Sequence, residues 1–271
     1  MDISKIYNIV NSELDPSFKN RSRAIIESII SHEPKRILDA GCGRGYYITL
    51  ASMLDFPVEI IGIDVNTKYL NLARANTHHD KRVIIKQSPI ESIPFPENYF
   101  DFIICSEVLE HVENDKKTLK ELHRVLKKGG TLLVTVPNKN FPFLWDPLNW
   151  SLMKFGNRHI DKNIWWLAGM WADHERLYTL NSARKALSYQ FKIIKAYELT
   201  RWGWPLTHFI LYGIGKNIVE KGVLSSFNRF NFNERGIITQ FLSKLISLPS
   251  TLLDPITKKG AAVNIVVEAQ K

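Results

Sequence analysis

The sequence predicts an α/β protein whose core is a doubly wound, mostly parallel β-sheet. Short apolar segments that suit buried strands alternate with amphipathic helical segments between residues 18 and 138. A glycine-rich turn follows the first of these apolar segments. Two later apolar segments, at about 191–198 and 261–269, bring the predicted sheet to seven strands. We expect a helical, aromatic-rich lid and an insertion to be added to this sheet.

The first half of the chain supplies five of the predicted strands and most of the helices. Residues 18–32 place isoleucines at helical spacing and form the first predicted helix. Buried strands are predicted at 35–40, 58–64, 83–85, 101–105 and 131–136. The intervening helices are one through Met53, one capped by Thr67 and running to about Asn76, and one capped by Asn114 and closed by Gly129 and Gly130.

The alternation of strands and helices stops after Asn138, and the chain is therefore expected to have three parts. Residues 1–138 form the ligand-binding core with its N-terminal helices, and residues 139–179 form a lid that is aromatic up to residue 172. Residues 180–271 complete the sheet. In this last part we expect a helix at about 180–189 and short amphipathic helices inserted at about 200–258.

Length and composition favour a single packed, cytoplasmic protein. The chain has 271 residues, of which 45 % are hydrophobic and 23 % are charged, so a sizeable core is expected. No apolar run approaches the ~18 residues that span a bilayer, and no export signal is visible at the N-terminus. Two cysteines do not make a disulfide framework.

The formal net charge of +9 is confined to the second half of the chain. Residues 1–138 contain 18 Lys and Arg against 18 Asp and Glu, whereas residues 139–271 contain 18 against 9. All seven tryptophans also lie in the second half: Trp145, Trp150, Trp165, Trp166, Trp171, Trp202 and Trp204. A neutral front half and a basic, aromatic back half indicate two different roles.

The strongest local signal is the turn Asp39-Ala-Gly41-Cys-Gly43-Arg-Gly45 between a strand and a helix. Glycines at such a turn let a ligand approach the backbone at the carboxyl end of the sheet. Tyr46 stands where a dinucleotide-binding fingerprint would need another glycine. Asp39 would repel a pyrophosphate but attract an ammonium or sulfonium group.

Four further segments follow this turn in order. The second strand ends in Asp64, an acidic residue suited to the two hydroxyls of a ribose. The others are 91–101, 105–112 and 122–130. With the glycine turn, these segments resemble the class I S-adenosylmethionine-dependent methyltransferases, in the branch that includes ubiquinone and menaquinone methyltransferases. The resemblance covers roughly residues 18–138 and implies a Rossmann-like methyltransferase fold, with S-adenosylmethionine as cofactor and S-adenosylhomocysteine as product.

The resemblance also implies a set of cofactor-binding residues. Asp39 would face the ammonium of the methionine end, Asp64 would hold the ribose, and Arg21 would lie near the carboxylate. Pro89 stands where the family usually has an acidic residue, so the hydrogen bond to adenine would fall to the Ile90 N–H, with help from Ser88. The full set is Arg21, Asp39, Gly41, Cys42, Gly43, Asp64, Val65, Ser88, Pro89, Ile90, Cys105, Ser106 and His111.

Methyl transfer from a sulfonium is an in-line displacement that depends mainly on alignment and exclusion of water. A hydroxyl or carbon acceptor also needs a base. The candidates are His111, His174 and Tyr178. No group of residues has the spacing of metal ligands, so no metal site is predicted.

The basic, aromatic back half favours a small acceptor with an apolar part, such as a lipid, a quinone or a lipid-linked glycan precursor. Basic amphipathic helices with aromatic residues are typical of proteins that dock on anionic membranes without spanning them, here the inner face of the membrane. The same features would suit an RNA methyltransferase. A third alternative is a non-catalytic cofactor-binding protein. The sequence leaves the oligomeric state open.

Overall fold

The computed structural model describes residues 3–164, 167–206, 228–230, 232, 236–257 and 260–271. Its centre is a seven-stranded sheet with the order β3-β2-β1-β4-β5-β7-β6. The strands are β1 (Arg36–Ala40), β2 (Glu59–Asp64), β3 (Val83–Gln87), β4 (Phe100–Ser106), β5 (Leu126–Pro137), β6 (Lys192–Leu199) and β7 (Asn264–Gln270). All neighbours pair in parallel except β7, which is antiparallel to both β5 and β6. The predicted seven-stranded, mostly parallel sheet is thus confirmed.

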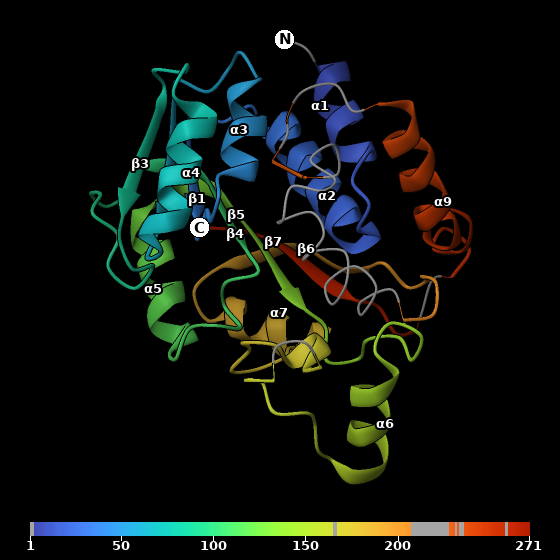
Figure 1. The fold of residues 1–271 in the computed structure, drawn as a ribbon. Coiled ribbons are helices and arrows are strands. Elements are labelled where there is room, and N and C mark those ends of the chain that lie inside the picture. The colour runs from blue at the N-terminus through green and yellow to red at the C-terminus, as the bar shows by residue number, and fades with distance from the viewer. Residues whose placement is uncertain (1–2, 165–166, 207–227, 231, 233–235, 258–259) are drawn as a thin grey trace.

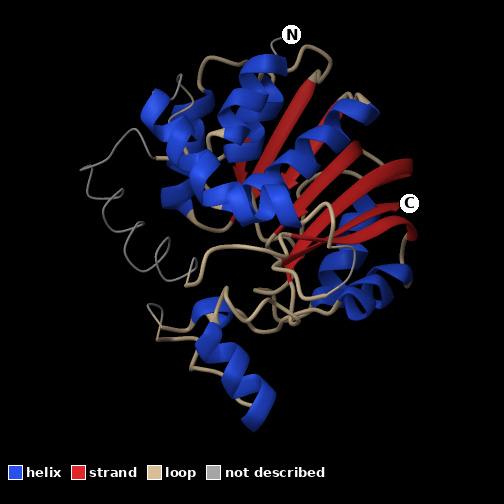
Figure 2. Ribbon diagram, turned by 90° about the vertical axis from the view of Figure 1, so that its right-hand side faces the viewer, coloured by secondary structure: helices blue, strands red, loops and turns tan. Residues whose placement is uncertain are grey.

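Helices cover both faces of this sheet (Figures 1 and 2). The α-helices in the described part of the chain are α1 (Ile3–Asn11), α2 (Pro16–His32), α3 (Tyr46–Ser52), α4 (Thr67–Thr77), α5 (Asp115–Val125), α6 (Pro147–Gly156), α7 (Leu180–Ser188) and α9 (Ile237–Leu253). One core cluster joins α1, α2, α3 and α4 to the sheet through residues such as Ile25, Ile48 and Leu70. The other joins α5 and α7 to the opposite face through Leu122 and Leu187.

Strand β1 is the point from which the sheet is wound in both directions. It pairs with β2 on one side, where Asp39 aligns with Gly62, and with β4 on the other, where Asp39 aligns with Ile104. The chain leaves β1 and β4 in opposite directions, and open α/β sheets bind ligands at the carboxyl ends of strands beside such a switch. The fold therefore directs attention to the ends of β1, β2 and β4.

Two local predictions for the front half were wrong, and one helix had no predicted range. N-terminal helices were expected, but only the one at 18–32 was located; α1 precedes it, with Ile6 and Val10 fully buried. Helix α4 is capped by Asn66 and not by Thr67, because the Asn66 side chain accepts hydrogen bonds from two main-chain N–H groups of the first turn. Gly129 and Gly130 do not close α5, which ends at Val125 and runs directly into β5.

The segment predicted as a lid contains α6, which stands apart from the sheet in both views (Figures 1 and 2). The rest of the segment has a small core of its own, in which Phe141, Trp145 and Met170 pack with Val263. Trp165 and Trp166 lie outside the described residues. This packing ties the predicted lid to the start of β7.

The predicted insertion at 200–258 differs from the expectation in its described part. Where several short helices were expected, α9 is one helix of 17 residues, and it lies beside α2 (Figure 1). Residues 207–227 of the insertion lie outside the described residues. Among the helices that the structure describes, none has the length and apolar character needed to cross a membrane.

Replacement of Gly45 by alanine is expected to destabilise the fold by about 2 kcal/mol or more. Gly45 has a φ of +80°, and an added Cβ would lie 2.9 Å from the Cβ of Ala73 in α4. Urea denaturation measures the change. Gly156→Ala is the control, because an added Cβ there meets nothing within 4 Å; equal stability of the two variants would contradict the packing described here.

Candidate cofactor and acceptor site

The glycine turn after β1 is held in place by the neighbouring strand and by the loop after β4. The N–H groups of Gly41 and Cys42 both donate to the carbonyl oxygen of Ile63 in β2, at 2.9 Å. Gly41 has a φ of +83°, and an added Cβ would lie 2.4 Å from Val108. At Gly43, by contrast, an added Cβ would meet nothing within 4 Å. The turn is closed on the Val108 side and open at Gly43, where a ligand can approach the backbone.

Asp39 lies at the end of β1 beneath this turn and is 2 % exposed. Its Oδ2 atom accepts no hydrogen bond from any described residue. Burial, reinforced by the nearby charge of Asp64, raises the pKa of Asp39 to about 8. A buried carboxylate without a partner is destabilising, and an ammonium group placed against it would remove that cost. The residue therefore fits the methionine end of S-adenosylmethionine.

Asp64, at the end of β2, holds the glycine turn and the start of α4 together. Its Oδ2 accepts from the N–H of Gly43 at 2.9 Å and its Oδ1 from the N–H of Asn66 at 2.8 Å. The residue is only partly buried, and Val65 beside it is 64 % exposed. A carboxylate has about four acceptor positions, so these two bonds leave Asp64 able to accept ribose hydroxyls.

The predicted adenine segment follows β3. The Ser88 N–H donates to the carbonyl oxygen of Asp64 at 3.1 Å, and the Ser88 hydroxyl donates to the carbonyl oxygen of Ser92 at 2.8 Å. Ser88 and Ile90 are buried, whereas Pro89 is exposed. The Ser88 hydroxyl is thus already used within the loop, and the roles predicted for these residues toward adenine stay predictions.

Arg21 in α2 is paired with an acidic residue that the sequence analysis did not single out. Its guanidinium forms an ion pair at 3.1 Å with Glu107, the residue directly after β4. Glu107 also accepts hydrogen bonds from Thr135 at 2.9 Å and Asn264 at 3.3 Å, and it has a φ of +55°. Three elements therefore converge on Glu107. The predicted contact of Arg21 with the cofactor carboxylate stays a prediction.

Both cysteines behave as small buried side chains. Cys42 and Cys105 are free and buried, and burial raises the pKa of each thiol above its usual value, so both stay protonated at neutral pH. Ser106, the last residue of β4, shares a 2.9 Å hydrogen bond with the Thr135 hydroxyl. Cys105 and Ser106 thus lie at the end of β4, and Cys42 lies in the turn after β1.

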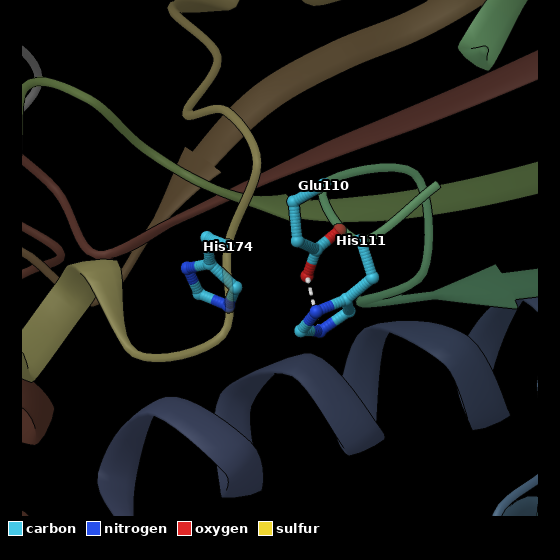
Figure 3. Close-up of side chains that lie close together, drawn as sticks. All are labelled: Glu110, His111 and His174. Carbon is cyan, nitrogen blue, oxygen red and sulfur yellow. Dashed lines mark ion pairs between the residues drawn. The ribbon is translucent and has the colours of Figure 1, made fainter. Parts of the chain in front are cut away.

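Two of the three predicted catalytic residues lie side by side. The ring centroids of His111 and His174 are 4.8 Å apart, although the residues are 63 positions apart in the chain. Glu110 lies next to the His111 ring and has no exposed surface (Figure 3). Burial and the nearby charge of Glu107 raise the pKa of Glu110 well above its usual value. The sequence shows the adjacent pair Glu110-His111, but only the fold brings His174 to it.

Tyr178, the third predicted catalytic residue, occupies a structural position. It is buried, and its hydroxyl donates to a carboxylate oxygen of Asp115 at 2.8 Å. Burial and this hydrogen bond raise the pKa of Tyr178 above its usual value. A tyrosine held in this way is a poor base at neutral pH, so the two histidines are the better candidates.

Comparison with known proteins adds a family to this geometry. The family described as a methyltransferase domain matches residues 38–134. This stretch begins in β1 and ends in β5, so it includes the glycine turn, Asp39, Asp64 and the Glu110-His111 pair.

Curated relatives match a similar stretch. The ubiquinone/menaquinone biosynthesis C-methyltransferase UbiE of Geobacter sp. (strain M21) is 31 % identical over 137 residues, which cover 49 % of this chain and 58 % of the relative. The ubiquinone biosynthesis O-methyltransferase of Acinetobacter baylyi is 29 % identical over 109 residues, which cover 39 % of this chain and 45 % of the relative. The chain thus spans about half the length of these relatives.

The likeness in fold extends further than the likeness in sequence. The crystal structure of an S-adenosylmethionine-dependent methyltransferase from Mesorhizobium loti superposes with a TM-score of 0.54 at 19 % identity and covers 92 % of this chain and 96 % of that one. The sheet order and the sequence matches both indicate a methyltransferase. The family implies S-adenosylmethionine as cofactor. Over residues 38–134, the chain matches the methyltransferase domain family, and the curated relatives that share a similar stretch are named as methyltransferases.

Proposed function

We propose that the protein transfers a methyl group from S-adenosylmethionine to a small acceptor with an apolar part. The observation that carries the first half of this proposal is Asp39, a buried carboxylate with an oxygen that has no hydrogen bond among the described residues, directly under an open glycine turn. The relatives named for ubiquinone and menaquinone biosynthesis support an acceptor of the quinone type.

In this mechanism the chain binds the cofactor and aligns it with the acceptor. The cofactor supplies a methyl group that is already activated on a sulfonium. Asp39 binds the ammonium and Asp64 the ribose, which fixes the donor at the ends of β1 and β2. The in-line geometry and exclusion of water then lower the barrier. A hydroxyl or carbon acceptor must also lose a proton, and His111 or His174 is proposed to take it.

The acceptor is proposed to arrive from a membrane surface, and the orientation of α9 supports this. The residues of α9 that pack against the protein are small and polar, namely Thr239, Ser243, Ser247 and Ser250. The Ser243 hydroxyl lies within hydrogen-bonding distance of the carbonyl oxygens of Asn11 and Glu13, at 2.8 and 2.7 Å. The outward residues are large and apolar, namely Ile237, Ile238, Phe241, Leu245, Leu248 and Leu252. A helix with its apolar side outward needs a partner.

The surroundings of α9 favour a lipid surface as that partner. Trp202 and Trp204 are 38 % and 45 % exposed and donate their indole N–H groups to Thr257 and to the carbonyl oxygen of Leu245. Tryptophan with one apolar and one polar end is enriched at membrane interfaces. Lys244 is exposed on α9, and the excess positive charge of the chain lies in this half. Lys216 and Lys221, which the sequence analysis includes in the basic insertion, lie outside the described residues.

Asp39→Asn is expected to weaken S-adenosylhomocysteine binding about tenfold or more, because a buried charge-assisted hydrogen bond contributes about 1.5–3 kcal/mol. Titration calorimetry measures the affinity. Asp55→Asn, which changes an exposed carboxylate, serves as the control and is expected to bind normally. Unchanged affinity in Asp39→Asn would defeat the assignment of this site.

The same substitution is expected to remove a pH dependence of stability. Between a pKa of 3.8 in the unfolded chain and about 8 in the folded protein, the unfolded state releases the Asp39 proton and the folded state keeps it. Wild-type stability therefore falls with rising pH in this window relative to Asp39→Asn, and the difference becomes constant above about pH 8. Urea denaturation from pH 5 to 9 without cofactor tests this. A difference that does not vary with pH would contradict it.

The protein is expected to bind vesicles that contain anionic phospholipid more tightly than neutral vesicles, and less tightly as salt rises. Phe241→Ser should weaken this binding about tenfold, since burying a large apolar side chain contributes about 1.5–3 kcal/mol. Val58→Ser is the control. Val58 is about as exposed as Phe241, at 61 % against 63 %, but it is not part of α9.

Two outcomes of the vesicle experiment would overturn the membrane part of the proposal. One is equal binding by the Phe241→Ser and Val58→Ser variants. The other is no binding to vesicles combined with binding to single-stranded RNA at physiological salt, which would favour the RNA methyltransferase alternative. Neither outcome affects the cofactor site.

A further inference from the structure

Three side chains with metal-ligating atoms meet beside the end of β4. Glu110 and His111 come from the turn between β4 and α5, and His174 comes from the segment that leads to α7 (Figure 3). One ligand atom from each residue lies within 4.8 Å of the others. The sequence analysis predicts no metal site because the third residue is far from the first two in the chain.

Glu110 is the unusual member of this cluster. Its side chain has no exposed surface, and neither carboxylate oxygen accepts a hydrogen bond from the described residues. The His111 ring lies beside it, with its Nε2 3.9 Å from Oε1 of Glu110. Buried carboxylates normally pair with a cation or bind a metal ion. A cation at this place would therefore supply the partner that the Glu110 carboxylate lacks among the described residues.

Both histidines are oriented by main-chain carbonyl groups. The Nδ1 of His111 lies 2.9 Å from the carbonyl oxygen of Asp173, and the Nδ1 of His174 lies 2.7 Å from that of Met170. A carbonyl oxygen can only accept, so each Nδ1 carries a hydrogen, and in the neutral ring the lone pair is on Nε2. Metal-binding histidines are typically oriented in this way, with the second nitrogen donating to a carbonyl or carboxylate.

The two segments are held together by contacts that do not involve the three side chains. The Glu175 N–H donates to the carbonyl oxygen of Glu110 at 2.8 Å. The Arg176 guanidinium donates to the carbonyl oxygens of Leu109 and Glu113, at 2.8 and 2.9 Å. The backbone on either side of the cluster is thus fixed without a metal ion, so the site is pre-organised.

We propose that Glu110, His111 and His174 bind a divalent cation of the zinc class. Two imidazoles and one carboxylate favour Zn²⁺ or a similar transition-metal ion over Mg²⁺ or Ca²⁺, which prefer oxygen ligands. Ligand atoms around a tetrahedral zinc ion are about 3.4 Å apart, so small side-chain rotations suffice to close the cluster. Three protein ligands leave at least one coordination position for water. With the ion bound, the Nε2 lone pairs of His111 and His174 are coordinated, so the proposed role of either ring as a base applies to the metal-free protein.

The test is a calorimetric titration of the chelator-treated protein with Zn²⁺ alone. We expect one ion per chain, and we expect His111→Ala and His174→Ala each to weaken binding by roughly tenfold or more. His78→Ala is the matched control, because His78 and His79 form an exposed pair of rings, tilted at 46° to each other, outside the cluster. Titration with Co²⁺ gives a second readout, the absorption spectrum of a four-coordinate ion.

Glu110→Gln tests the buried carboxylate, and circular dichroism shows whether that variant is folded. If it does not fold, the two histidine variants carry the test, because His111 lies at the surface. Zn²⁺ affinity that is equal in the cluster variants and in His78→Ala would mean adventitious surface binding and would overturn the proposal. Absence of binding to the wild-type protein would do the same. The titration uses no S-adenosylmethionine, so either failure leaves the proposed methyl transfer untouched.

Discussion

The buried carboxylate of Asp39 is the constraint around which the front of the molecule is arranged. It sits at the end of the strand from which the sheet is wound both ways, under a turn that Ile63 and Val108 fix in place. Asp64, one strand away, stabilises that turn through the Gly43 N–H, and burial of Asp39, reinforced by the charge of Asp64, raises the pKa of Asp39. Burying this carboxyl group carries an electrostatic cost, and the ammonium group proposed to bind here would remove it.

The back half is arranged around a different requirement. Helix α9 is attached to the fold by hydroxyl groups, with Lys19 of α2 reaching Ser243 and Ser247 at 3.5 and 3.4 Å. These contacts are weak compared with the burial of a leucine face, and they leave the apolar side chains outside. A chain that leaves these side chains outside its own core can bury them against another surface.

The sequence predicts the front half well because its signals are local. The glycine turn, Asp39 and Asp64 are recognised from spacing along single elements, and the structure places them together at one edge of the sheet. The wrong cap of α4 also arises from a local ambiguity, because asparagine and threonine both make good N-caps. The backbone conformation at Asn66 lets its side chain accept hydrogen bonds from two N–H groups of the first turn.

The features that escaped the sequence analysis depend on contacts between distant segments. An amphipathic helix has two faces, and the sequence of α9 does not say that the serine face packs inward; the carbonyl groups of Asn11 and Glu13 decide it. In the same way, Glu107 is visible only as one acidic residue among several until Arg21, Thr135 and Asn264 converge on it. The meeting of His174 with Glu110 and His111 likewise requires the complete topology.

The antiparallel strand β7 has a consequence for how the molecule is assembled. It occupies an interior position between β5 and β6, yet it follows every other strand in the chain. During synthesis, β6 therefore has no partner in the sheet until the whole stretch containing α9 has left the ribosome. The five strands β1 to β5 can pair first. Strands β6 and β7 are separated by the long connection that contains α9, and bringing its ends together costs entropy and time. Strands β1 to β5, which carry the glycine turn and Asp64, can thus form first, and β6 and β7 are added last.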